Sequence, residues 1–289
     1  MKQIVIKVIY DNCKANERCQ EGWGFSCLVD LGHRKILFDT GADAKAFFSN
    51  LQKLNIQCDQ ITDVVLSHKH SDHIAGFEEV IGKLKKGSRL FLPKKFPSKK
   101  IPSDVQTEIV EDLTEIYPNN LKNREFDKEA PQNFCLERVT IAGKQGTSED
   151  KNSEGMPMQS KTDSSGCLGI YSGIYSLVLK GGFRLYEQAL ILQTQKGLVI
   201  ITGCAHPGIV HILEEAQKRL KQPIHLVLGG FHLFRKKQSQ IDEIVNKFKT
   251  LQVQIAAPCH CSGDLAIEQF RQVFQENFYK IGTGTTLTL

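Results

Sequence analysis

The sequence lacks the segments that would place a protein in a membrane or direct it to secretion. No apolar run is long enough to cross a bilayer, and Met1–Lys7 does not resemble a secretory leader. The nine cysteines are scattered and odd in number, unlike the paired cysteines of small disulfide-rich domains. We therefore expect a cytoplasmic protein with reduced thiols and no membrane association.

Strong charge and nucleic-acid motifs are also missing. The 289 residues carry a formal net charge of +5, and pairs such as Lys85-Lys86 spread this mild excess along the chain. Such a charge is typical of an ordinary solvated surface. The alternative interpretation of the excess is that it attracts anionic substrates such as phosphate esters. We expect a small-molecule substrate and no nucleic-acid partner. The oligomeric state stays open.

Hydrophobic periodicity predicts regular elements along most of the chain. Alternating or β-branched runs predict strands at 3–10, 24–31, 35–38, 63–66, 188–194, 198–202, 224–228 and 253–257. Apolar residues at helical spacing predict helices at 42–54, 74–84, 207–220, 241–251 and 264–274. This order predicts sheets covered by helices in a single domain over residues 1–289.

The stretch from about 94 to 166 differs from the rest of the chain. Residues 94–132 are polar and punctuated by proline, and residues 146–165 are rich in serine, glycine and charge. This composition predicts a flexible insertion inside the domain. A lid over the site and simple disorder are both open interpretations of the 146–165 loop.

Four side chains that ligate divalent metals occur within six residues: His68, His70, Asp72 and His73. The segment follows a predicted strand and precedes a helix, so a loop can turn all four toward one point, which a strand could not do. Two ions about 3.5–4 Å apart need such a dense supply of ligands. We predict a two-metal site here and assign Asp72 a catalytic role as well.

Further histidines follow later strands. His206, His232 and His260 each come at the end of a predicted strand, and strand ends at one sheet edge are where α/β proteins build sites. We predict His206 and His260 as ligands, whereas His232 could equally support a ligand or face the substrate. The other histidines are predicted to be surface or packing residues: His33, His211 and His225.

These motifs resemble those of a known family. The His68–His73 segment resembles the H-x-H-x-D-H signature of the metallo-β-lactamase superfamily, Phe38-Asp39-Thr40-Gly41 its upstream Asp motif and Pro258-Cys259-His260 its late His motif. Tyr10-Asp11-Asn12 and Thr202–Ile209 resemble one subgroup. That subgroup includes the archaeal dihydropterin–ribofuranosylaminobenzene phosphate synthase and many metal-dependent hydrolases.

The resemblance implies an α/β (α+β) fold, a four-layer αββα sandwich with two divalent ions, of which zinc is expected and manganese or iron are alternatives. It implies that Asp39 supports the metal-binding loop, and Asn12 is a further candidate near the ligands or the substrate. The chain departs from the family because no histidine lies between His73 and His206, and Cys204 stands in the usual place of a bridging Asp. We predict His206 as the ligand and keep Cys204 as its rival.

The expected activity is that of a metal-dependent hydrolase, which uses a metal-activated hydroxide on a phosphoester or a related anionic small molecule. One alternative is a transferase like the pterin synthase of the subgroup. A second is a non-catalytic metal-dependent binding protein. Intact ligands without turnover on any ester would favour the second alternative.

Overall fold

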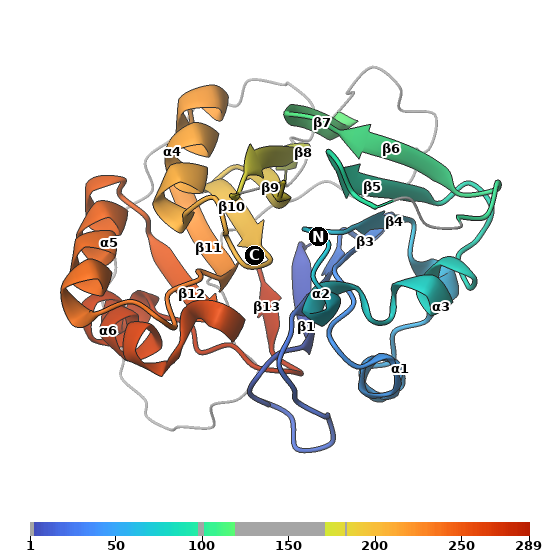
Figure 1. Ribbon diagram of the computed structural model, residues 1–289, viewed down its shortest axis with the longest axis horizontal. Helices are drawn as coiled ribbons and strands as arrows, with labels where there is room; N and C mark the ends of the chain where they lie inside the picture. The colour runs from blue at the N-terminus through green and yellow to red at the C-terminus, as the bar shows by residue number, and fades with distance from the viewer. Residues whose placement is uncertain (1–2, 98–100, 119–170, 183) are drawn as a thin grey trace, which may run out of the picture.

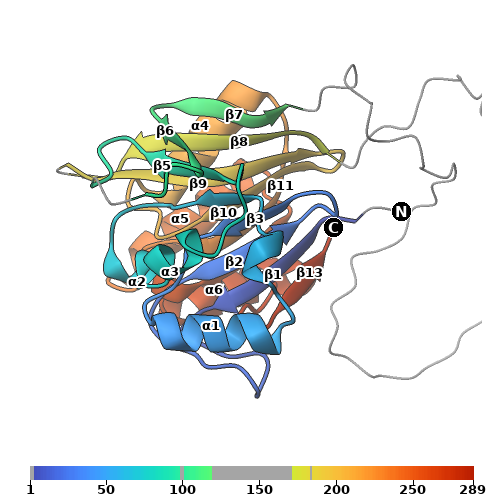
Figure 2. The same ribbon diagram turned by 90° about the vertical axis from the view of Figure 1, so that its right-hand side faces the viewer.

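The computed structural model describes residues 3–97, 101–118, 171–182 and 184–289. Two β-sheets pack face to face, and helices cover the outer face of each sheet (Figures 1 and 2). The predicted four-layer αββα sandwich is therefore confirmed. In the part of the chain that the structure describes, no helix is long and apolar enough to span a bilayer.

The first sheet has the order β13-β1-β2-β3-β4-β5-β6. Its strands are β1 (Val5–Tyr10), β2 (Ser26–Asp30), β3 (Lys35–Phe38), β4 (Asp63–Val65), β5 (Arg89–Pro93), β6 (Gln106–Val110) and β13 (Thr286–Thr288). Pairing is antiparallel from β13 to β3 and parallel from β3 to β6. The helical elements of this half are α1 (Ala44–Lys53), η1 (Cys58–Gln60), α2 (Ser71–Ile74) and α3 (Phe77–Ile81).

The second sheet has the order β12-β11-β10-β9-β8-β7. Its strands are β7 (Leu113–Pro118), β8 (Tyr171–Lys180), β9 (Tyr186–Thr194), β10 (Gly197–Thr202), β11 (Ile224–Gly230) and β12 (Ile255–Cys259). Strands β10, β11 and β12 are parallel, so their carboxyl ends meet at one edge. The helical elements of this half are α4 (Ile209–Leu220), α5 (Gln238–Thr250), η2 (His260–Ser262), α6 (Asp264–Phe274) and η3 (Gln275–Asn277).

The apolar run of β10 shows how one strand serves two cores. Val199 and Ile201 point into the core between the sheets, whereas Leu198 and Ile200 pack under α4, α5 and α6. Alternate residues of a strand face opposite sides, so a sheet buried on both faces requires such a continuous apolar run. A third core lies between the first sheet and its helices.

Two local predictions differ from the structure. The segment 94–166 was expected to be a flexible insertion, yet β6 and β7 lie within it, because each adds to a sheet edge, β6 beside β5 and β7 beside β8. Residues 119–166 of that segment, including the 146–165 loop, lie outside the described residues. The predicted helix 74–84 is two short helices, α2 and α3, on either side of Ala75 and Gly76.

Candidate metal centre

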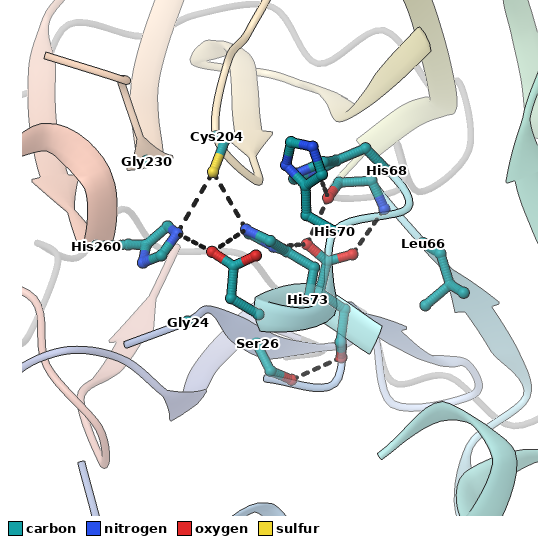
Figure 3. Close-up of polar contacts among 12 residues, drawn as sticks. Gly24, Ser26, Leu66, His68, His70, His73, Cys204, Gly230 and His260 are labelled. Carbon is teal, nitrogen blue, oxygen red and sulfur yellow. Dashed lines mark hydrogen bonds and ion pairs between the residues drawn. The ribbon is translucent and has the colours of Figure 1, made fainter. Parts of the chain in front are cut away.

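Chain segments from both sheets meet at one edge of the sandwich (Figure 3). His68 follows β4, Cys204 and His206 follow β10, and His260 follows β12. Ala205 and His260 have positive φ angles of 59° and 49° there, a conformation that non-glycine residues rarely adopt. Such strained backbone persists where the surroundings hold it, and it is concentrated at functional sites.

The first donor group contains Asp72, His73, Cys204 and His260, whose ligating atoms all lie within 4.8 Å of one another. Cys204 Sγ lies 3.2 Å from His73 Nε2 and 3.4 Å from His260 Nε2 (Figure 3). Asp72 Oδ2 lies 3.7 Å from His73 Nε2 and 3.5 Å from His260 Nε2. One oxygen, two nitrogens and one sulfur therefore converge on one point.

The second donor group shares the same thiol. His68, His206 and Cys204 also offer atoms within 4.8 Å of one another. His70 completes the cluster, because His68 Nε2 lies 3.0 Å from His70 Nδ1 and the His70 and His206 rings are 4.8 Å apart. The structure thus brings together all six predicted ligands, and Cys204 lies between the two groups.

The spacing of these atoms can be compared with that around a real ion. Nitrogen at about 2.0 Å and sulfur at about 2.3 Å from a tetrahedral zinc ion lie about 3.3 to 3.6 Å from each other. The distances of the first group run from 3.2 to 3.7 Å, so each lies within about 0.1 Å of this range. The donor set therefore fits a divalent ion of the zinc type.

Two imidazoles of the first donor group are held by a partner on the side that faces away from the centre. Nδ1 of His73 lies 2.7 Å from Asp39 Oδ2, and Nδ1 of His260 lies 3.0 Å from Asn12 Oδ1. Asp39 also accepts hydrogen bonds from the backbone and hydroxyl of Ser67, which fixes the metal-binding loop. With Nδ1 engaged, the Nε2 atoms face the centre, which is how metal-binding histidines are oriented.

Glu187 holds the Nδ1 side of His206 in the same way, although no sequence pattern pointed to this residue. This buried carboxylate of β9 lies 2.7 Å from His206 Nδ1 and accepts hydrogen bonds from the backbone amides of Cys204, Ala205 and His206. One side chain therefore fixes both the loop after β10 and the ring of a ligand. A single Glu in an apolar strand carries no motif, so only the fold reveals it.

The ionisation of the imidazoles and carboxylates suits metal binding. Burial, with the charge of His260, lowers the pKa of His73 to about 3, and burial lowers the pKa of His68. Burial alone would raise the pKa of Asp72, but hydrogen bonding to His260 and the charge of His73 lower it overall. Near neutral pH these histidines are neutral and this carboxylate is ionised, the forms that ligate metals.

The thiol differs from these groups. A hydrogen bond with Cys261, together with burial, raises the pKa of Cys204 well above its usual range. A metal that binds the thiolate must therefore displace the thiol proton.

The remaining sequence candidates lie around the centre. Cys204, His232 and Cys261 form a third group of potential donors within 4.8 Å, and His232 Nδ1 is buried without a hydrogen-bond partner. Cys259 and Cys261 are buried, as expected for small apolar residues. A Cβ on Gly230 would lie 2.7 Å from Cys261 Sγ, so only glycine leaves room for the Cys261 side chain there.

The late ligand is also tied to the beginning and end of the described chain. Asp11 Oδ1 accepts a hydrogen bond of 2.9 Å from the backbone N–H of His260. The backbone N–H of Asp11 in turn donates to Thr283 Oγ1 at 2.9 Å. The position of His260 is therefore linked to residues near both ends of the described chain.

Comparisons with solved structures agree with this fold. The chain is similar to Tm1679, a metal-dependent hydrolase of the β-lactamase superfamily, with a TM-score of 0.65 and 27% identity over 99% of both chains. Its fold is also that of the metallo-β-lactamase fold protein YhfI from Bacillus subtilis, with a TM-score of 0.56, 13% identity and complete coverage of both chains. The chain therefore has the metallo-β-lactamase fold, and its resemblance to proteins of that superfamily is confirmed.

The resemblance to one subgroup is confirmed as well. The chain is 27% identical to the 7,8-dihydropterin-6-methyl-4-(β-D-ribofuranosyl)-aminobenzene-5′-phosphate synthase of Methanocaldococcus jannaschii, over 90% of this chain and 88% of that protein. A family described as anti-Pycsar protein Apyc1 matches residues 16–113, less than half of the chain.

Proposed function

We propose that this protein is a metal-dependent hydrolase that binds two divalent ions and cleaves a phosphoester or a related anionic small molecule. The observation that carries the proposal is the position of Cys204 Sγ, which belongs to both the first and the second donor group. A side chain that offers its atom to two adjoining donor groups can bridge two ions, which in two-metal sites lie about 3.5–4 Å apart.

We assign one ion to Asp72, His73, Cys204 and His260, and the other to His68, His70 and His206 with Cys204 shared. Imidazole-rich ligation favours zinc over magnesium, which prefers oxygen ligands, and manganese or iron could compete. Bound ions of this kind supply an activated water and polarise the oxygen atoms of an ester.

The protein's own groups would orient and complete the reaction. Asp39, Glu187 and Asn12 hold the Nδ1 side of three ligands, so the Nε2 lone pairs stay aimed at the centre. Asp72 is ionised and its side chain is 20% exposed, so we assign it to accept a proton from the attacking water. His70 is exposed, so the second donor group is open to solvent on that side.

A second candidate function rests on the synthase relative, which matches 90% of this chain. In that case the same centre would serve a transferase reaction and not hydrolysis. The fold is compatible with both reactions, because fold alone does not decide chemistry.

The test is a panel of phosphomonoesters, phosphodiesters, lactones and thioesters, assayed with metal-loaded protein and with the His73→Ala variant as a matched inactive control. Turnover by the wild type that the variant and a chelator both abolish is expected. Turnover only when an amine or aryl acceptor is added would favour the transferase. Metal binding without turnover in either assay would overturn both and favour a binding protein.

A further inference from the structure

Two aromatic side chains next to the metal centre are exposed. Trp23 and Phe234 are 50% and 41% exposed, and only Ile109 and Leu265 among the described large apolar residues share this degree of exposure. The Trp23 and Phe234 rings lie 5.7 Å apart at an angle of 73°, an edge-to-face pair. Adjoining exposed aromatics of this kind mark a binding surface more often than isolated apolar residues do.

This aromatic pair contacts the residues of the centre directly. The indole N–H of Trp23 donates to Asp72 Oδ2 at 3.1 Å, and the indole ring lies 5.1 Å from the His260 ring. Phe234 lies 5.6 Å from the His232 ring. A ligand whose ring stacks on Trp23 and Phe234 would therefore be long enough to reach the metal ligands with its other end.

Positive charge adjoins the same surface. The Arg235 guanidinium lies 5.1 Å from the Phe234 ring centroid, and Lys236 and Lys237 follow it, all exposed. Cations beside an apolar platform favour ligands that combine a flat ring with an anionic group.

We propose that Trp23 and Phe234 form a subsite for a planar aromatic ring of the substrate, whose phosphoryl group lies at the metal centre. This inference rests on the proposed function only in placing the phosphoryl group there. The proposed subsite restricts the expected substrates to aryl or heteroaryl phosphoesters. The competing explanation is that Trp23 serves only to position Asp72 through its indole N–H.

Trp23 is the only tryptophan in the chain, so its fluorescence reports this subsite. Metal-free protein is titrated with two matched pairs of probes: adenosine 5′-monophosphate against ribose 5-phosphate, and phenyl phosphate against methyl phosphate. We expect a saturable change with each aryl probe, at an affinity about tenfold or more above that of its alkyl partner. Equal responses within both pairs would overturn the proposal.

Phe234→Ala tests the pair without touching Asp72. It should weaken aryl binding by about tenfold and leave alkyl binding unchanged. Ile109→Ala, which also removes a half-exposed apolar residue but on β6, is the matched control and should change neither. Loss of aryl preference in the control, or its retention in Phe234→Ala, would contradict the assignment.

Trp23→Phe separates the subsite from the positioning role, with calorimetry in place of fluorescence. The phenyl ring of Trp23→Phe can still stack on an aryl ligand, so this variant should keep most of the preference for aryl over alkyl probes. If Trp23 only positions Asp72, kcat should instead fall equally for aryl and alkyl esters. Binding is measured on metal-free protein, so it does not depend on the hydrolase activity. If the protein prefers aryl probes but hydrolyses no ester, the proposed function alone is overturned. Hydrolysis without aryl preference would overturn the subsite alone.

Discussion

Glu187 Oε2 lies 2.7 Å from Nδ1 of His206 and also accepts the backbone N–H of the same residue at 2.8 Å. One ionised carboxylate thus fixes both the ring and the main chain of a candidate ligand. Burial would raise the pKa of Glu187, but the charges of His68 and His206 lower it overall, so the group stays ionised. The arrangement makes Glu187 the support on which the second donor group depends.

Glu187→Gln should therefore weaken metal binding without removing a ligand. The amide keeps the shape but loses the charge that orients the imidazole, and changes to such supports cost about 10–100-fold in metal affinity. Competition with a chromophoric chelator measures the effect. Glu214→Gln on the exposed face of α4 is the control, and equal affinities in the two variants would show that Glu187 has no such role.

Protein purified without chelator should contain close to two equivalents of divalent transition metal, with zinc the main species. Chelation should lower the melting temperature, because an ion that binds only the folded state stabilises it. Elemental analysis and calorimetry test both points. Preparations free of transition metal would contradict the assignment of the two donor groups.

His70→Ala should lose one ion and most activity while the protein stays folded. His70 is exposed and outside the buried cores, so its loss removes little packing. His68→Ala should have the same effect on metal, although this residue is fully buried. A thermal melt that is no longer cooperative in His70→Ala would show a structural role instead.

Cys204→Ser and His206→Ala should differ in how many ions they affect. Cys204 belongs to both donor groups, so its loss should weaken both ions, whereas His206 belongs to one. Thiolate is a good zinc ligand and serine hydroxyl is not. Metal stoichiometry across a titration separates the cases, and two tightly bound ions in Cys204→Ser would remove the thiol from the site.

Asp63→Asn should destabilise the fold by about 3 kcal/mol, because one partner of a buried ionic network is lost. Asp63 is fully buried at the start of β4, 2.9 Å from Arg34 Nη1 and 2.6 Å from Arg89 Nε. Urea unfolding measures the change. Asp59→Asn in η1, where the side chain is 54% exposed, should change stability little, and a similar loss there would contradict this reasoning.

The sequence predicted the parts of the site that are local. The signature from His68 to His73 is contiguous, and His206 and His260 follow apolar strands that periodicity reveals. Glu187 was not predicted, because a single Glu in β9 acquires meaning only when the second sheet is in place. Trp23 belongs to a segment that resembles the same subgroup, but its contact with Asp72 becomes visible only in the folded chain.

In the fold, too, the predictable elements were those that the local sequence specifies. Runs such as 198–202 specify buried strands by composition alone. β8 was missed because Ser172, Gly173 and Ser176 interrupt its apolar pattern, and its place is fixed by pairing with β7 and β9. β6, whose residues are mostly exposed, is likewise defined by its neighbour β5 and not by its own hydrophobicity.

The hydrogen bonds of Asp11 have a consequence for the order in which the molecule is made. Asp11 is separated by 249 positions from His260 and by 272 from Thr283. At a synthesis rate of about 5–20 residues per second, roughly 12 to 50 s pass between the addition of Asp11 and that of His260. Strand β1 therefore emerges from the ribosome long before β13, one of its two partners in the first sheet. A nascent chain that stops short of His260 would carry the H-x-H-x-D-H loop without the last candidate ligand of the centre.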